Sequence, residues 1–89
     1  MTKGQTRRSD FMPKPIYSER HQRLLALLVA ARKSSGLTQA QVAAKLGRPQ
    51  SYVAKYERGE RRLDVLEYLD VAEAVGFDPC DLLRSVGTM

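Results

Sequence analysis

Residues 38–59 decide the fold of this 89-residue chain, and they read TQAQVAAKLGRPQSYVAKYERG. Gly47 lies where a left-handed residue can end one helix, and Pro49 suits the first turn of another. The stretch therefore predicts two short helices, at about 38–46 and 49–58, joined by a very short turn. Gly59 ends the second of them.

Three helix starts in the chain share one local design. Each has a capping residue with an acid or amide three positions on, and apolar residues directly before the cap and four after it, the pattern of a capping box with a hydrophobic staple. The three sets are Leu37, Thr38, Gln41 and Val42; Leu63, Asp64, Glu67 and Tyr68; Phe77, Asp78, Asp81 and Leu82. With a further helix predicted at 18–34, capped by Ser18, we expect helices at 64–75 and 78–86, five helices in all and no strand.

Two helices across so short a turn match the helix-turn-helix, whose second helix is free to enter a major groove. The predicted inner face consists of Val42, Ala43, Leu46, Val53 and Tyr56, and the outward face of the second helix of Gln50, Ser51, Tyr52, Ala54 and Lys55. Amide, hydroxyl, ammonium and methyl groups are those that contact base edges. An ordinary solvated helix face would have the same composition.

Charge is divided unevenly along the chain. Residues 1–36 carry a balance of +6, residues 37–62 carry +4, and residues 63–89 carry −5, within a net charge of +5. A polyanion would therefore meet the first two-thirds of the chain. A single cysteine, Cys80, excludes an internal disulfide and fits a reducing compartment. With no predicted membrane span or signal peptide, we expect a cytoplasmic protein.

The chain divides into an arm, a domain and a short tail. Residues 1–17 are basic, contain Pro13 and Pro15, and lack apolar periodicity, so they predict a flexible arm. That arm either reaches a neighbouring groove of DNA or is a disordered tail. Residues 18–86 form the predicted domain, with the helix-turn-helix at 38–59, and residues 87–89 are the tail.

Residues 37–76, LTQAQVAAKLGRPQSYVAKYERGERRLDVLEYLDVAEAVG, resemble the Cro and lambda-repressor family of helix-turn-helix domains, also called XRE-type. The shared motifs are TQ opening the first helix, LG at the turn, YERG ending the second, and LxxAxAxG over 69–76. The resemblance covers about residues 20–83 and implies a compact all-α bundle of five helices. This agrees with the number counted from the caps.

The resemblance also implies roles for individual residues. Gln50, Ser51 and Lys55 would contact bases, while the contacts to the DNA backbone or to thymine would come from Gln39, Arg48, Tyr52, Arg61 and Arg62. Arg32 and Glu57 would form a structural ion pair, because an outward carboxylate would repel DNA. The chain departs from the family at Pro49, where many members have Ser or Thr.

These features predict a sequence-specific transcriptional regulator, a repressor that binds an inverted repeat of double-stranded DNA as a homodimer through helix five and the C-terminus. The alternative is a partner-dependent module, such as an antitoxin, with secondary DNA binding. Enzyme activity is not expected, because the single histidine, His21, has no catalytic or metal-ligand pattern around it. No cofactor, metal or small-molecule ligand is implied.

Overall fold

The computed structural model of the chain describes residues 18–88, and these form five helices with no strand among them. The helices are α1 (Glu19–Ser34), α2 (Gln39–Leu46), α3 (Gln50–Glu57), α4 (Val65–Val75) and α5 (Pro79–Gly87). The prediction of an all-α five-helix bundle is confirmed, with boundaries within two residues of those expected. The proposed N-terminal arm and Met89 lie outside the described residues.

Side-chain caps begin four of the five helices. At α2 the Thr38 hydroxyl accepts from the backbone N–H of Gln41 at 3.1 Å, and the Gln41 side chain accepts from the N–H of Thr38 at 2.8 Å. The equivalent bonds between Asp64 and Glu67 begin α4. At α5 Asp78 caps the helix. Within residues 18–88, however, the shorter side chain of Asp81 does not accept a hydrogen bond from the backbone N–H of Asp78.

The turn between α2 and α3 is built on Gly47, which ends α2 in the left-handed conformation with a φ of 68°. The next residue, Arg48, donates its backbone N–H to Ala43 at 2.9 Å and so closes the turn. Pro49 then precedes α3 with an extended ψ of 155° and supplies no side-chain cap. Only a residue that tolerates positive φ allows the chain to reverse so tightly here.

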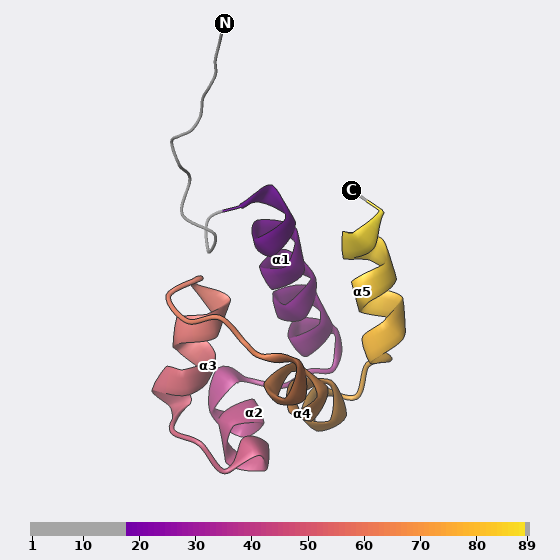
Figure 1. Cartoon of the computed structure of the whole chain (residues 1–89). Coiled ribbons are helices and arrows are strands. Elements are labelled where there is room, and N and C mark those ends of the chain that lie inside the picture. Colours follow the sequence, from indigo (N-terminus) through magenta and orange to yellow (C-terminus); the bar gives the residue numbers. More distant parts are fainter. Residues whose placement is uncertain (1–17, 89) are drawn as a thin grey trace, which may run out of the picture.

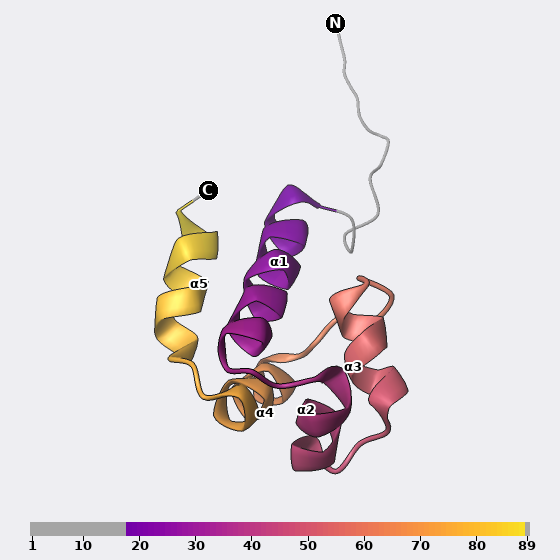
Figure 2. The same ribbon diagram turned by 180° about the vertical axis from the view of Figure 1, so that it is seen from behind.

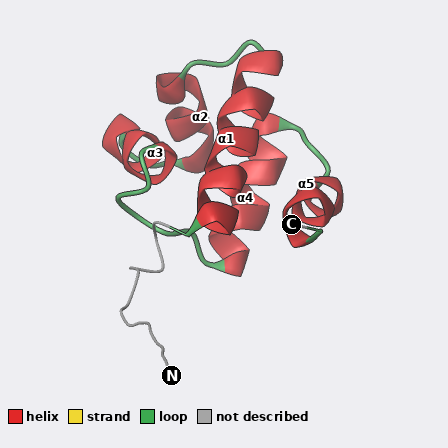
Figure 3. Cartoon of the chain, turned by 90° about the horizontal axis from the view of Figure 1, so that it is seen from above, coloured by secondary structure: helices red, strands yellow, loops and turns green. Residues whose placement is uncertain are grey.

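The helices pack around one apolar core in which α1 is central. Figures 1 and 2 show α1 and α5 side by side, with α4 passing across their lower ends next to α2. Seen from above, α3 and α5 lie on opposite sides of the bundle (Figure 3). The most deeply buried large side chains come from four helices, and they are Leu28, Val42, Val53, Tyr56 and Val71. This arrangement leaves one side of α3 facing away from the other helices.

Candidate nucleic-acid interface

The two sides of α3 differ sharply in burial. Val53 and Tyr56 are 0% and 1% exposed, and they anchor the helix against α1 and α2. Gln50, Ser51 and Lys55 are exposed, and their side chains form no hydrogen bond or ion pair within residues 18–88. Their polar groups are therefore available to a ligand. All three come from the first six residues of the helix, the part that enters the major groove in helix-turn-helix proteins.

Glu57 lies at the end of α3 and faces inward. Arg32 of α1 contacts it through two hydrogen bonds, Nε to Oε2 at 2.7 Å and Nη2 to Oε1 at 3.1 Å. Arg32 also donates from Nη1 to the carbonyl of Leu37 at 3.0 Å. The ion pair with Glu57 raises the pKa of Arg32. The structure thus brings together the two residues predicted to pair, with side chains only 12% and 6% exposed.

Gln39 at the start of α2 joins the same network. Its side-chain amide donates to Glu57 Oε1 at 2.9 Å, so one carboxylate binds groups from both α1 and α2. Gln39 was predicted to contact a phosphate. One N–H of the side-chain amide donates to Glu57. The second N–H and the side-chain carbonyl have no partner within residues 18–88.

Tyr52 was expected on the outward side of α3, and this placement is wrong. Tyr52 is only 9% exposed, and its ring packs edge-on against Tyr56, with centroids 5.8 Å apart. The guanidinium groups of Arg48 and Arg61 lie over the ring, at 4.8 and 4.7 Å from its centroid. The two arginines and the apolar packing below cover the ring, and burial raises the pKa of its hydroxyl.

Arg61 and Arg62, both predicted to face the DNA backbone, have different surroundings. Arg61 donates to the carboxylate of Glu67 on α4, at 3.0 Å from Nη1 and 2.6 Å from Nη2. Arg62 is exposed and its side chain has no ionic partner within the described chain. The two N–H donors of Arg61 lower the pKa of Glu67 to about 2. Sequence spacing did not predict this pair, because six residues separate the partners across an irregular connection.

A second kind of surface lies on α4 and was not predicted. Val65, Leu66 and Leu69 are 74%, 71% and 44% exposed, and Leu83 of α5 is 48% exposed. A hollow of about 150 Å³ lies beside them, lined in part by Val65 and Leu83. The signal in the sequence was that apolar residues cover more of the α4 surface than one buried face requires. We call these four residues the α4 apolar face.

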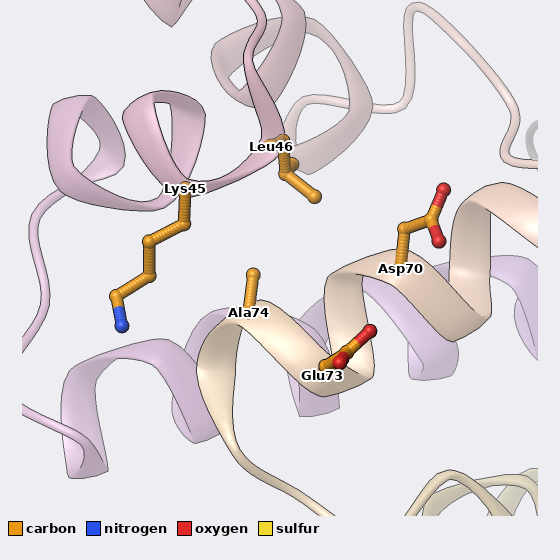
Figure 4. A pocket seen from close by; sticks show the side chains of 5 residues that line it. All are labelled: Lys45, Leu46, Asp70, Glu73 and Ala74. Atoms are coloured by element: carbon orange, nitrogen blue, oxygen red, sulfur yellow. The ribbon is translucent and has the colours of Figure 1, made fainter.

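A larger, polar groove separates α2 from the later part of α4. Lys45 and Leu46 line one side, and Asp70, Glu73 and Ala74 line the other (Figure 4). The charges make it suited to solvent rather than to an apolar ligand. Among residues 18–88, no cluster of three or more His, Cys, Asp or Glu side chains could hold a metal ion. No helix in that range has the length and apolar character needed to cross a membrane.

The comparisons with known proteins agree with this geometry. Residues 28–82 match a family model described as helix-turn-helix. An XRE-family like protein from Pseudomonas syringae pv. tomato str. DC3000 is 51% identical, with a TM-score of 0.75 over 79% of this chain and 85% of that chain. The clp gene regulator ClgR from C. glutamicum is 25% identical, with a TM-score of 0.70 over 81% and 95%.

A further solved structure is that of the restriction-modification controller protein C.AhdI from Aeromonas hydrophila. It is 32% identical, with a TM-score of 0.62 over 67% of this chain and 91% of that chain. The search of curated proteins found no match.

The fold and the exposed face of α3 define a DNA-binding helix-turn-helix protein of the class that regulates transcription. Within that class, the chain belongs to the XRE-type family. The predicted resemblance to this family is confirmed.

Proposed function

We propose that the protein is a sequence-specific transcriptional repressor that inserts α3 into the major groove of double-stranded DNA. The observation that supports this most directly is the exposed group of Gln50, Ser51 and Lys55, which lies on a helix fixed from behind by buried Val53 and Tyr56. Gln can bind adenine through two hydrogen bonds, and Lys can donate to guanine. Two of the similar proteins are a gene regulator and a restriction-modification controller protein.

The test is selection of bound duplexes from a random pool, followed by titration of the enriched sequence at physiological salt. We expect an inverted repeat whose half-site is specified by α3. Substituting Lys55→Gln should weaken binding to that sequence by about tenfold, as loss of one base contact costs about 1–3 kcal/mol. Equal affinity for all duplexes would contradict sequence-specific binding.

Lys45→Gln is the matched control for Lys55→Gln. It removes the same charge from a neighbouring helix, but Lys45 lines the groove between α2 and α4, across from Asp70 and Glu73 (Figure 4), and is not on the outward side of α3. We expect binding by this variant to stay within about twofold of the wild type, since a distant rim charge changes only the long-range attraction. Equal losses in the two variants would mean that net charge, and not contact by α3, determines affinity.

The second part of the proposal is that the repressor is a homodimer. A helix as short as α3 contacts few base pairs, so a specific site needs two copies of it. The prediction placed the interface on helix five and the C-terminus, but Leu82 and Val86 are buried within the chain. The α4 apolar face, which adds one residue of α5, is the larger exposed apolar surface and therefore the better candidate.

Charge also favours a second copy of the chain as the partner at this face. A two-fold interface must be complementary to itself, so both signs of charge should surround it. Exposed Asp64 lies directly before Val65, exposed Arg62 lies three residues before it, and exposed Asp70 follows Leu69. A strongly basic or acidic partner would instead favour a rim of one sign. An antitoxin-like function, in which another protein covers this face, is the alternative.

Sedimentation of the full chain tests the dimer. We expect a dimer for the wild type and a monomer for Leu66→Glu, because two buried carboxylates facing each other would oppose association. Ala30→Glu is the control, since this exposed position lies in the groove between α1 and α5. A dimer that survives Leu66→Glu and dissociates with Ala30→Glu would move the interface to that groove. A wild-type monomer that binds a different protein would favour the alternative function.

A further inference from the structure

The ring of Tyr52 is held rigidly at the start of α3. It is 9% exposed, and its edge-on contact with Tyr56 has an interplanar angle of 79°. Tyr56 is itself 1% exposed and lies in the core. A ring packed in this way offers a buried platform on the helix that carries Gln50, Ser51 and Lys55.

The two guanidinium groups over this ring differ in what else holds them. Arg61 donates twice to Glu67 and once to the carbonyl of Arg62, at 2.9 Å. Arg48 is exposed, and its side chain forms no hydrogen bond or ion pair within the described residues. Within residues 18–88 its guanidinium lies over the ring of Tyr52, at 4.8 Å from the centroid, and acts at longer range on the charge of Glu67. All of its N–H donors are thus available, on a group whose place the ring restricts.

Glu67 makes this arrangement electrostatically possible. Two cations over one ring repel each other, and a carboxylate beside them offsets that repulsion. Both Arg61 and Arg48 lower the pKa of Glu67, with Arg61 having the larger effect. The cluster of two arginines and one glutamate keeps one net positive charge, and the cation without an acidic partner is Arg48, in the turn before α3.

We propose that Tyr52 is a positioning residue that acts through Arg48. Its buried ring holds the Arg48 guanidinium next to the start of α3, where it can bind a phosphate flanking the groove that α3 enters. This role rests on the proposed DNA binding and replaces the predicted direct contact of Tyr52 with phosphate or thymine. Ordering a long side chain before binding reduces the entropy lost on association, so the stacked arginine binds more tightly than a mobile one.

A double-mutant cycle tests the proposal with random-sequence duplex DNA of about 25 base pairs as the probe, followed by fluorescence anisotropy. Arg48→Gln should weaken binding about fivefold and reduce the slope of log K against log salt by about 0.9, the effect of one phosphate contact. Tyr52→Leu should weaken binding about threefold. In the Tyr52→Leu background, Arg48→Gln should cost only about twofold more, because the ring no longer orders the arginine.

Tyr52→Phe is the matched control, since it keeps the ring and removes only the hydroxyl. We expect it to bind like the wild type. If Tyr52→Phe lost as much affinity as Tyr52→Leu, the hydroxyl and not the ring would be responsible, through DNA or through its interaction with Glu67, and the positioning role of the ring would be overturned. A fivefold cost of Arg48→Gln in both backgrounds would overturn it as well.

A second measurement avoids dependence on the folding of Tyr52→Leu. Protons held over an aromatic ring resonate upfield, so the δ-methylene protons of Arg48 in the DNA-free wild type should be displaced from their random-coil positions in the NMR spectrum. Their displacement should persist in Tyr52→Phe. Random-coil positions in the wild type would contradict the proposal. If the wild type bound no duplex at all, the proposed function itself would fail.

Discussion

Some residues of the bundle fix α3 in place, and others are exposed to solvent on the outward side of α3. Arg32 belongs to the first group, because its guanidinium binds Glu57 of α3 and the carbonyl of Leu37. Both charged side chains are largely buried, so each depends on the other for compensation.

Replacing Arg32 with alanine should therefore destabilise the fold strongly. We expect the free energy of unfolding to fall by about 3–5 kcal/mol, since Glu57 would remain as a buried charge with only Gln39 to bind it. Chemical denaturation measures the change. Arg58→Ala is the control, because the side chains of its pair with Glu60 are 58% and 53% exposed and solvent screens such a pair, so it should contribute little to stability. Equal effects of the two substitutions would contradict a structural role for the buried pair.

Glu67 makes the stability of the fold depend on pH. Its hydrogen bonds with Arg61 lower its pKa from 4.5 to about 2 in the folded protein. A lowered folded-state pKa means that the stabilisation is complete above the unfolded value of 4.5 and is lost as the pH falls towards 2. Glu67→Gln should be less stable than the wild type by about 1 kcal/mol near neutral pH, with solvent screening included.

The difference between these two proteins should shrink as the pH falls below about 4.5 and nearly vanish only below the folded-state pKa of about 2, where the wild-type carboxyl is protonated in the folded protein as well. Urea denaturation across this range gives the comparison. A difference that stayed constant from neutral to acidic pH would show that the new glutamine amide in the capping position, and not the lost charge of Glu67, accounts for the lower stability.

At the scale of helices, the starts and ends were the best predicted features. Thr38 with Gln41 and Asp64 with Glu67 cap their helices by bonds between near neighbours, so their geometry follows from local sequence. Tyr52, by contrast, was misplaced. The spacing of four to buried Tyr56 already places Tyr52 beside the buried side of α3. What α3 alone does not show is that Arg61 and Glu67, which lie beyond it in the chain, help to cover the ring.

Replacing the glycines at the ends of α2 and α3 with alanine should destabilise the fold to different extents. Gly47 and Gly59 have φ angles of 68° and 80°, so an alanine at either position would be strained by about 1–2 kcal/mol. At Gly47 an added Cβ meets nothing within 4 Å, whereas at Gly59 it lies 3.2 Å from Leu25 Cδ1. We expect Gly59→Ala to lower the melting temperature more than Gly47→Ala. The reverse order would mean that Leu25 moves aside at little cost.

Positive and negative charges predominate in different segments of the chain. The segment 37–62, which includes α2 and α3, has a balance of +4, and the segment 63–89, which includes α4 and α5, has −5. This distribution was evident from sequence alone. The α4 apolar face was not, because the sequence does not tell which of several apolar positions on a helix other helices will cover.

Because the segment that includes α2 and α3 is basic, the affinity for DNA should fall steeply as the salt concentration rises. Each phosphate neutralised by Lys or Arg contributes about 0.9 to the slope of log K against log salt. Arg62→Gln should lower the slope by about that amount, because this exposed guanidinium has no ionic partner within residues 18–88. Arg84→Gln, on acidic α5 and paired with Asp81, should leave the slope unchanged. Equal slopes for both variants and the wild type would remove Arg62 from the interface.

The separation of the two sides of α3 has a consequence for how such proteins diversify. Positions 50, 51 and 55 touch nothing in the core, and exposed substitutions of this kind usually alter stability by less than about 0.5 kcal/mol. If these side chains contact bases as proposed, exchanging them would change the DNA sequence that is bound while Val53, Tyr56 and Glu57 keep the scaffold unchanged. On that proposal, gene duplication followed by substitution at these positions would give regulators that bind different DNA sequences on the same scaffold.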